Sequence, residues 1–532
     1  MELFKEGTGH PSTQNTALES LSSLSTKPTP MSLFTSLTWL PFPSVLLLVP
    51  ILFLSTHIMF KRSRPSPQLP PGPSQLPFIG NLHQVGALTH SSLRSLSIQY
   101  GPLMHLKLGS LPTLVVSSAK YAREVMKYQD LDFCSRPSFL SQKRLSYNFL
   151  DIAFAPYGAY WREMRKVSMV ELFSTKRTQS FRFIREEEVA RMMTSISKSS
   201  SKPINLSDML MTLASNIICR AAFGKYYTGE GSEKGDFNRV FGETQATFVA
   251  FFVADFIPWL GWIDKINGQC ARLEKNFYEL DDFYEKVIEE HLDPKRDKLE
   301  QDDFVDVLLQ VQKDLKLPRD NAKAILMNIL VAGTDTGSAT STWAMTELVK
   351  NPKVLKKAQD EVRRVIGRKN KVEESDLLQL QYLKLVVKET FRLHPPAPLL
   401  LPRETIRHCK IDGYDILPKT LVFINAQAIG RDPDCWRHPD EFMPERFMGS
   451  EIDYKGQHFE FIPFGAGRRI CPGMLVGTTS VELALANLLY LFNWELPSGT
   501  NIEDLDMSEA PGITAHKKYS LLLVATNYDG SN

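Results

Sequence analysis

The sequence lacks the motifs of several common protein classes. Its six cysteines include no C-x-x-C pair, so neither a zinc site nor a disulfide framework is indicated. The lack of C-x-x-C-H argues against covalent attachment of a c-type haem. There are no internal repeats and no glycine-rich nucleotide-binding motif. A formal net charge of +2 gives no reason to expect nucleic acid as a partner.

What is present is the composition of an ordinary globular protein. Hydrophobic residues make up 43% of the 532 residues and charged residues 23%, which suffices for a large core. Beyond residue 80 most apolar residues recur with helical spacing. We therefore expect one large domain over 81–532, mainly α with small β-sheets.

The predicted elements follow from this periodicity and from turn signals. We expect helices near 157–173, 179–197, 268–292, 321–349, 352–366, 376–393 and 475–491. We expect a hairpin of 103–108 and 113–117, and short strands near 411–416, 421–424 and 519–525.

The N-terminal part has a different character. Residues 1–30 are rich in Ser and Thr, and we expect them to be disordered. Residues 31–60 contain an apolar run of about 20 residues, enough for one membrane span. Lys61 and Arg62 follow at once, which favours a cytosolic location for the rest of the chain. This predicts a single-pass N-terminal anchor in the endoplasmic reticulum membrane, with a cleaved signal peptide or a buried helix as alternatives.

A proline-rich stretch, 61–80, separates this predicted anchor from the domain. It contains Leu69-Pro70-Pro71-Gly72-Pro73. Polyproline geometry makes such a segment a semi-rigid hinge rather than a floppy linker.

One cysteine stands in an unusual setting. The stretch from Phe464 to Gly473 reads F-G-A-G-R-R-I-C-P-G and precedes an apolar helical run. The helix dipole and the neighbouring arginines are expected to lower the pKa of the Cys471 thiol and favour the thiolate. A thiolate is an electron-rich ligand for iron. For a lone thiol, a buried structural cysteine would be the preferred explanation.

The complete pattern F-x-x-G-x-R-x-C-x-G resembles the cysteine-ligand loop of the cytochrome P-450 family, the haem-thiolate monooxygenases. The resemblance implies haem b (iron protoporphyrin IX) as cofactor, with Cys471 as the axial ligand of the iron. It also implies that Phe464, Gly467, Arg469 and Gly473 help to bind the haem, with Arg469 paired to a propionate. The family fold is mainly helical, and in microsomal members an N-terminal membrane anchor helix precedes it.

Further residues match the family's propionate ligands. Trp161 and Arg165 lie four residues apart and share one face of the predicted helix, so both could donate to one carboxylate. A surface amphipathic helix would explain this spacing alone. The family's W-x-x-x-R pair implies propionate binding, and Arg403 matches a further propionate ligand.

A polar run interrupts the apolar helix 321–349. Residues 332–336 read A-G-T-D-T, and such residues in mid-helix cost stability and can open or bend the helix. A kink for packing is the simple explanation. The run resembles the family's [A/G]-G-x-[D/E]-T motif, which implies that Gly333 brings backbone near the haem. The same motif implies that Asp335 and Thr336 relay protons for oxygen activation.

Two motifs suggest a structural network. Glu389 and Arg392 form E-x-x-R, and Arg446 lies in P-E-R-F. An exposed ion pair with this spacing contributes little. In the family these three side chains form one buried network, so we assign them to structure and not to catalysis.

The motifs occur in the family's order over roughly residues 65–525 and resemble those of plant microsomal members of specialised metabolism. The resemblance implies insertion of one oxygen atom from O2 into a lipophilic small molecule with electrons from NADPH. Because no nucleotide-binding motif is present, a separate NADPH-cytochrome reductase is expected to deliver the electrons. Cytochrome b5 is an additional candidate partner. Apolar and aromatic residues in 139–154 and 248–256 also favour a lipophilic substrate.

Two other functions stay open at this point. The first is a haem-thiolate lyase, isomerase or dehydratase that works without a reductase, and therefore without NADPH. The second is a haem sensor that binds ligands and forms no product. The motifs indicate the reaction class and leave the substrate open.

Overall fold

The computed structural model describes residues 67–227, 232–296 and 301–529. The chain divides into two compact units, Met1–Pro67 and Gln68–Asn532, and every element named below belongs to the second. The predicted disordered segment 1–30 and the predicted anchor 31–60 lie outside the described residues.

Helices make up most of the second unit. They are α2 (Thr89–Tyr100), α3 (Ala119–Arg123), α4 (Asp130–Phe133), α5 (Leu140–Leu145), α6 (Ala159–Val167), α7 (Thr175–Ser180), α8 (Arg182–Lys198), α9 (Leu206–Phe223), α10 (Ser232–Phe248), α11 (Val253–Phe256), α12 (Ile263–Ile266), α13 (Gln269–Leu292), α14 (Phe304–Leu315), α15 (Arg319–Lys350), α16 (Pro352–Ile366), α17 (Gln381–Leu393), α18 (Ala426–Gly430) and α19 (Met474–Leu491). Short 3-10 or π turns are η1 (Leu82–Gln84), η2 (Glu124–Tyr128), η3 (Ser168–Leu172), η4 (Pro258–Leu260), η5 (Glu374–Gln379), η6 (Pro444–Phe447), η7 (Gly467–Arg469) and η8 (Ile502–Asp504).

The described strands form three small sheets. They are β1 (Leu103–Leu108), β2 (Leu111–Val116), β3 (Pro203–Asn205), β4 (Arg403–Glu404), β5 (Cys409–Ile411), β6 (Tyr414–Ile416), β7 (Leu421–Ile424), β8 (Phe492–Glu495) and β9 (Leu522–Asn527). The largest sheet has the order β1-β2-β7-β4, the second β3-β9-β8, and the third is the pair β5-β6. β1 and β2 form an antiparallel hairpin, and β7 runs parallel to β2.

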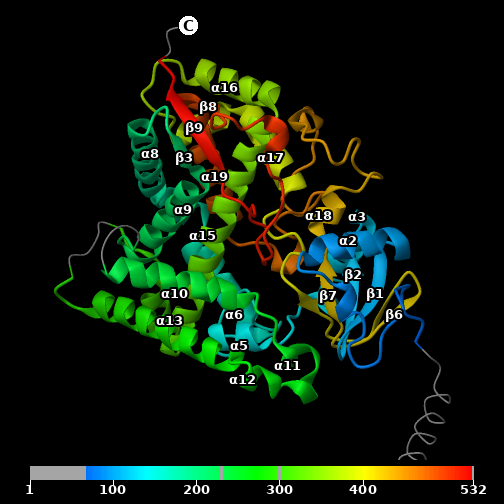
Figure 1. Ribbon diagram of the computed structural model, residues 1–532. Coiled ribbons are helices and arrows are strands. Elements are labelled where there is room, and N and C mark those ends of the chain that lie inside the picture. The colour runs from blue at the N-terminus through cyan, green and yellow to red at the C-terminus, as the bar shows by residue number, and fades with distance from the viewer. Residues whose placement is uncertain (1–66, 228–231, 297–300, 530–532) are drawn as a thin grey trace, which may run out of the picture. The chain divides into compact units, whose positions relative to one another are not determined.

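The long helix α15 runs through the middle of this unit (Figure 1). It packs against α9 on one side and against α19 on another. In Figure 1 the large sheet, with α2 and α3 beside it, lies to one side of α15, and α8, α10 and α13 lie to the other. Most of α15 is buried because its apolar residues belong to two of the hydrophobic clusters that fill the unit.

The strongly periodic helices match their predicted positions. The segments 268–292, 352–366 and 475–491 are α13, α16 and α19 within one residue at each end. The predicted helix 157–173 is α6 followed by the π turn η3, and 376–393 is η5 followed by α17. Sequence periodicity did not reveal α2, α9, α10 or α14. In α9 most residues of the second half are buried all round, so no polar face marks the helical period.

The predicted single strand 411–416 is wrong, because this segment is a tight hairpin of β5 and β6. The turn is made by Asp412 and Gly413, which have φ angles of 48° and 86°. A left-handed conformation at two successive residues reverses the chain, and Asp-Gly is a sequence that tolerates it.

The second half of the predicted hinge 61–80 belongs to the second unit and is hydrogen-bonded within it. The backbone N–H of His105 donates to the Pro71 carbonyl at 2.8 Å. The Asn81 side chain donates to the Ser74 carbonyl at 3.1 Å. These bonds hold the proline-rich segment against β1.

By length and composition, one described helix, α19, could cross a membrane, and a bent helix pair from Arg239 to Ile266 passes the same test. Over half of the apolar window in α19, 56%, is buried inside the protein. Leu483, Leu485 and Leu488 are fully buried in the core. The apolar character of α19 is therefore that of a core helix.

The E-x-x-R and P-E-R-F motifs meet in one buried network. Arg392 donates from Nε and Nη2 to the two carboxylate oxygens of Glu389, each at 2.8 Å. Arg446 Nε reaches the same carboxylate at 2.9 Å, and the side chains of Glu389 and Arg392 are both fully buried. The network therefore ties α17 to the segment that contains η6.

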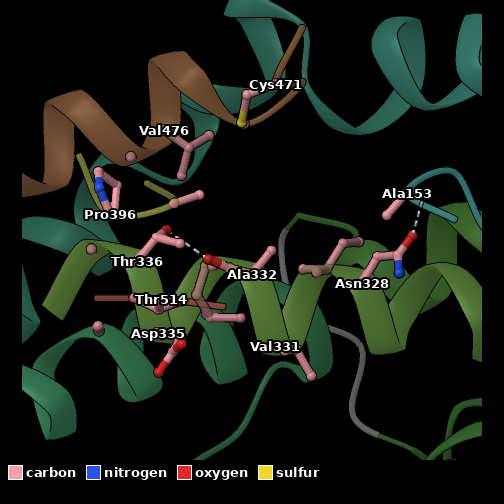
Figure 2. A pocket seen from close by; sticks show the side chains of 18 of the residues that line it. Ala153, Asn328, Val331, Ala332, Asp335, Thr336, Pro396, Cys471, Val476 and Thr514 are labelled. Carbon is pink, nitrogen blue, oxygen red and sulfur yellow. Dashed lines mark hydrogen bonds between the residues drawn. The ribbon is translucent and has the colours of Figure 1, made fainter. Parts of the chain in front are cut away.

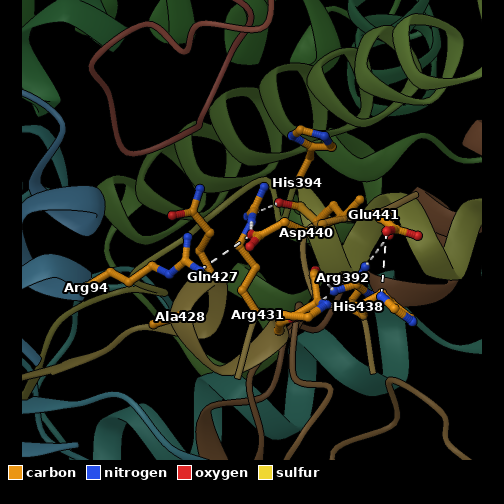
Figure 3. A network of polar contacts seen from close by, with 12 residues as sticks. Arg94, Arg392, His394, Gln427, Ala428, Arg431, His438, Asp440 and Glu441 are labelled. Carbon is orange, nitrogen blue, oxygen red and sulfur yellow. Dashed lines mark hydrogen bonds and ion pairs between the residues drawn. The ribbon is translucent and has the colours of Figure 1, made fainter. Parts of the chain in front are cut away.

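Arg392 also orders the backbone around it (Figure 3). Its guanidinium donates to the carbonyl oxygens of Gly430, Pro439 and Glu441. Nearby, Asp440 contacts Arg431 and Arg94, which extends the polar network to α18 and α2. Every donor of this guanidinium is directed to protein acceptors, which is typical of a structural role.

We predict that Glu389→Ala lowers the free energy of unfolding by about 3–5 kcal/mol, because two buried guanidinium groups lose their carboxylate. The variant should not retain haem. Thermal unfolding and haem absorbance measure both effects. As a control, Asp360→Ala removes the exposed i,i+4 pair with Lys356 and should cost less than about 0.5 kcal/mol. Normal haem content in Glu389→Ala would refute the structural assignment.

Candidate active site

The described residues enclose a cavity of about 640 Å³. Its walls are the middle of α15, the loop before α19, the end of α10 and the segments 152–154 and 511–516. Figure 2 shows the Cys471 sulfur directed into this space, across from α15. The cysteine loop and the A-G-T-D-T run, found separately in the sequence, therefore line one cavity.

The cysteine loop is held by backbone and ring contacts. The Cys471 N–H donates to the Phe464 carbonyl at 3.0 Å, which closes the loop. The Phe464 ring packs edge-on against Phe391 at 5.0 Å between centroids. Gly467 has a φ of 68°, and a Cβ there would lie 2.4 Å from the Met126 carbonyl oxygen. No other residue fits at Gly467 without displacing backbone.

The prediction that the protein lowers the pKa of Cys471 is wrong. Burial raises the pKa of this thiol and outweighs the lowering effects of the Gly473 N–H and the Arg165 charge. The Gly473 N–H belongs to the helix terminus that the sequence suggested, whereas the lowering charge is Arg165 and not the neighbouring Arg468 or Arg469. Desolvation is larger because the sulfur is enclosed by apolar walls. A metal cation would favour the thiolate far more strongly than these protein groups do.

Arginine side chains gather at one edge of the cavity. Arg469 donates from Nε to the Cys134 carbonyl at 2.8 Å and from Nη2 to the Ala155 carbonyl at 2.7 Å. Its Nη1 is buried and has no hydrogen-bond partner. Burial lowers the pKa of Arg469 to about 9. An unpaired donor on a buried cation indicates a site that fits an anion.

Arg403 and Arg165 line the same cavity. Arg403 is held by the buried Asp130 at 2.9 Å and by the Ala466 carbonyl at 3.0 Å. Arg165 donates from Nη2 to the Ile470 carbonyl, directly before the cysteine. Each guanidinium carries five donors, so both keep N–H groups for a ligand.

Two further residues have no motif in the sequence analysis: Arg136 at this edge, and Asp130, which contacts Arg403. Arg136 lines the cavity and donates from Nη1 to the Leu401 and Pro402 carbonyls, each at 2.7 Å. Asp130 binds Arg403 and also accepts from the Arg468 backbone N–H at 3.0 Å. Arg136 stands in the apolar context F-C-S-R-P, which was the one available signal that it is buried.

Five arginines line the cavity, and Arg185 among them is paired with Glu374. The other four fit the carboxylates of a haem. Within the described part of the chain, Arg403 has a carboxylate partner, whereas Arg136, Arg165 and Arg469 are held by carbonyl oxygens. Buried cations without anionic partners are unfavourable. Two propionates at this edge would supply the missing negative charge, and the thiol of Cys471 lies in the same cavity.

Trp161 takes a different position from the one predicted. It is 3% exposed, does not line the cavity, and its Nε1–H donates to the Ile152 carbonyl at 2.9 Å. The Arg469 guanidinium lies 4.0 Å from the centre of its ring. Trp161 therefore supports Arg469 through a cation–π contact, while Arg165 of the predicted pair lines the cavity.

The A-G-T-D-T run does not open the helix as predicted, and α15 is an unbroken α-helix from Arg319 to Lys350. The Thr336 hydroxyl donates to the Ala332 carbonyl at 2.8 Å, one turn earlier. This side-chain bond satisfies the hydroxyl within the helix, without a break in it.

Thr336 and Asp335 point in different directions, because successive helical residues are about 100° apart. In Figure 2 Thr336 lies on the side of α15 that faces Cys471, and Asp335 points away from it. The Asp335 Oδ1 atom lies 2.6 Å from Gln245 Nε2 and 2.7 Å from His516 Nε2. Sequence reasoning missed both partners, because neither belongs to a motif.

Gly333 is explained by helix packing. A Cβ at this position would lie 2.6 Å from Cδ1 and 2.9 Å from Cγ1 of Ile218 in α9. Gly333 also lines the cavity, and its role near the haem stays a prediction. Its missing side chain is what lets α9 approach α15.

A sequence model of the cytochrome P-450 family matches residues 70–523 of the chain. The protein belongs to the cytochrome P-450 family. Strychnine-11-hydroxylase of Strychnos nux-vomica is 54% identical over 464 residues, which are 86% of this chain and 91% of that protein. Cytochrome P-450 71A9 of Glycine max is 53% identical, over 86% of this chain and 93% of the relative. Cytochrome P-450 71B10 of Arabidopsis thaliana is 48% identical, over 92% and 99%.

Solved structures agree with this assignment. A zebrafish cytochrome P-450 with progesterone superimposes with a TM-score of 0.72 at 26% identity, over 82% of this chain and 99% of that one. A zebrafish cytochrome P-450 with abiraterone superimposes with a TM-score of 0.71 at 25% identity, over 84% of this chain and 100% of that one. The protein is thus a plant-type cytochrome P-450 monooxygenase of specialised metabolism, and the family implies a haem cofactor.

We predict that Gly333→Ala destabilises the protein by about 1–3 kcal/mol, because the new methyl group overlaps Ile218. Ile218→Val removes the nearest atom, so the double variant should lose less stability than the sum of the single variants. Denaturant unfolding measures these differences. Gly337→Ala is a matched control on α15, since a Cβ there meets nothing within 4 Å. Equal losses for Gly333→Ala and Gly337→Ala would contradict this packing role.

We also predict that Arg469→Leu weakens haem retention by about 1.5–3 kcal/mol, the contribution of a hydrogen bond to a charged group. Haem transfer to apomyoglobin measures the rate of loss. Arg468→Leu is the control, because the Arg468 side chain is 49% exposed. Equal haem loss in both variants would count against a propionate role for Arg469.

Proposed function

We propose that this cytochrome P-450 inserts one oxygen atom of O2 into a lipophilic plant metabolite, using NADPH electrons from a separate reductase. One observation carries the proposal. A single cavity holds the thiol of Cys471, an edge of partly unpaired arginines, and the Thr336 hydroxyl on the opposite wall. These groups are what a haem-thiolate oxygenase requires from its protein.

The residues present would hold haem b in this cavity. Cys471 would ligate the iron, and Arg136, Arg165, Arg403 and Arg469 would bind the propionates. When bound, the haem supplies the oxidative chemistry, and the thiolate ligand favours O–O cleavage. Gly473 leaves open space beside the cysteine, since a Cβ there would have no neighbour nearer than Phe173 at 4.0 Å.

The protein's own contribution to oxygen activation is proton delivery. Thr336 holds a proton on Oγ1 at the wall that faces Cys471. This proton is donated to the Ala332 carbonyl, so the O–H rotates toward the cavity before it is transferred. Asp335 directly precedes Thr336 on α15, lines the cavity, and can exchange protons with water there. We assign the acid role to Asp335 and the direct donor role to Thr336.

The cavity walls favour a lipophilic and aromatic substrate. Phe154 and Phe248 stack at 5.5 Å between centroids, with an interplanar angle of 21°, and both line the cavity. Ile329 and Val331 of α15 add aliphatic surface. The relative named strychnine-11-hydroxylase acts on strychnine by its name. A lipophilic metabolite suits the apolar walls of this cavity.

The proposed location is the endoplasmic reticulum membrane. Residues 31–60 would form the single anchor, 61–80 the hinge, and 81–532 the cytosolic haem-thiolate domain. The apolar run before Lys61 and Arg62 supports this arrangement. NADPH-cytochrome reductase is the proposed electron donor, with cytochrome b5 as an additional partner.

The test uses microsomes that contain the protein and a reductase, incubated with a lipophilic plant extract with and without NADPH. We expect an NADPH-dependent product heavier by one oxygen atom, and a thiolate-type reduced-CO spectrum. Product formed without NADPH and without added oxygen would instead establish a lyase or isomerase.

Thr336→Ala tests the proton role. We expect product formation to fall by about 10²-fold, the lower range for loss of a general acid, while the reduced-CO spectrum is kept. Thr340→Ala is the matched control one turn later on α15, where the buried hydroxyl bonds the Thr336 carbonyl. Full activity in Thr336→Ala would argue against the monooxygenase mechanism.

A further inference from the structure

Asp335 is held by residues that lie far from it in the sequence. Gln245 comes from α10, 90 residues before Asp335. His516 comes from the segment after Thr514, 181 residues beyond it. All three line the cavity, and both partners contact the same carboxylate oxygen, Oδ1.

The two partners differ in their chemistry. The Gln245 amide can donate a hydrogen bond to Asp335, but an amide does not exchange protons readily between its atoms. The His516 imidazole can accept a proton on one ring nitrogen and release one from the other. His516 is therefore the partner of Asp335 that can carry a proton.

His516 is also more exposed to solvent than the carboxylate it contacts. Its side chain is 30% exposed, whereas that of Asp335 is 16% exposed. The backbone around it is fixed, because the His516 N–H donates to the Thr514 carbonyl at 3.1 Å and its carbonyl accepts from Ala510 at 2.8 Å. With Nε2 at the carboxylate, Nδ1 lies on the far edge of the ring, where no described protein group bonds it.

We propose that His516 is a positioning residue that conveys protons from solvent to Asp335. Nδ1 takes a proton from a hydronium ion or a buffer acid, and the proton on Nε2 passes to Oδ1 of Asp335. The ring is left neutral with its proton on Nδ1. Loss of this proton to water and uptake of one from water at Nε2 restore the starting tautomer. This inference rests on the proposed function, in which Asp335 serves oxygen activation.

Two substitutions separate proton conduction from simple positioning. His516→Gln keeps an N–H that can donate to Asp335 but cannot relay a proton, and His516→Ala removes both abilities. We expect both to lower product formed per NADPH consumed by at least about threefold, less than the 10²–10⁴-fold typical of a group that acts directly. Both should enlarge the solvent deuterium isotope effect and leave the reduced-CO spectrum unchanged. Lys518→Ala, an exposed change in the same segment, should match the parent.

A second readout does not depend on turnover. Because His516 and Asp335 are in contact, the fall in melting temperature for His516→Ala with Asp335→Asn should be smaller than the sum for the single variants. Additive falls would overturn the contact on which the inference depends.

The outcomes distinguish this inference from the proposed function. If His516→Gln retains the parent's product yield and isotope effect, His516 only positions Asp335, and the proton-conveying role is overturned while the monooxygenase function stands. If the parent forms no NADPH-dependent oxygenated product from a panel of lipophilic alkaloids and terpenoids, both proposals fail.

Discussion

Buried positive charge is the constraint on which the arrangement of the cavity depends. A guanidinium in the interior is unfavourable unless its charge and its donors find partners. The carbonyl oxygens of Cys134, Ala155 and Leu401 meet Arg469 and Arg136. Separate loops are thereby drawn to one edge of the cavity, next to the cysteine loop.

The two groups of buried arginines in this protein differ in a way that reveals their roles. Arg392 has a carboxylate, Glu389, and every remaining donor is directed at a backbone oxygen, so its charge is balanced by the fold itself. Arg469 has no carboxylate and keeps a buried N–H without a partner. All hydrogen-bond donors of Arg392 are satisfied by the protein. Arg469 keeps one donor and its charge for an anion.

Helix α15 serves several functions because its faces meet different surroundings. Gly333 allows close approach of α9, Thr336 faces the cysteine side of the cavity, and Asp335 reaches toward His516. The polar run in the sequence is therefore a set of residues with separate tasks. Because α15 is unbroken, the directions of these three side chains are fixed relative to one another. A local opening of the helix would change those directions.

Sequence reasoning determined the family, the cysteine loop that lines the cavity and the partners of the buried ion network, because these residues occur in short motifs with fixed spacing. It also located the long helices with a clear polar face, such as α13 and α16. It could not reveal α9, whose buried second half lacks a polar face. Only the tertiary structure decided that Trp161 stands behind Arg469, that Arg136 joins the cavity edge, and that Asp335 meets His516. The physical reason is that side-chain direction and contacts between distant segments depend on how the helices pack, and no local pattern encodes that packing.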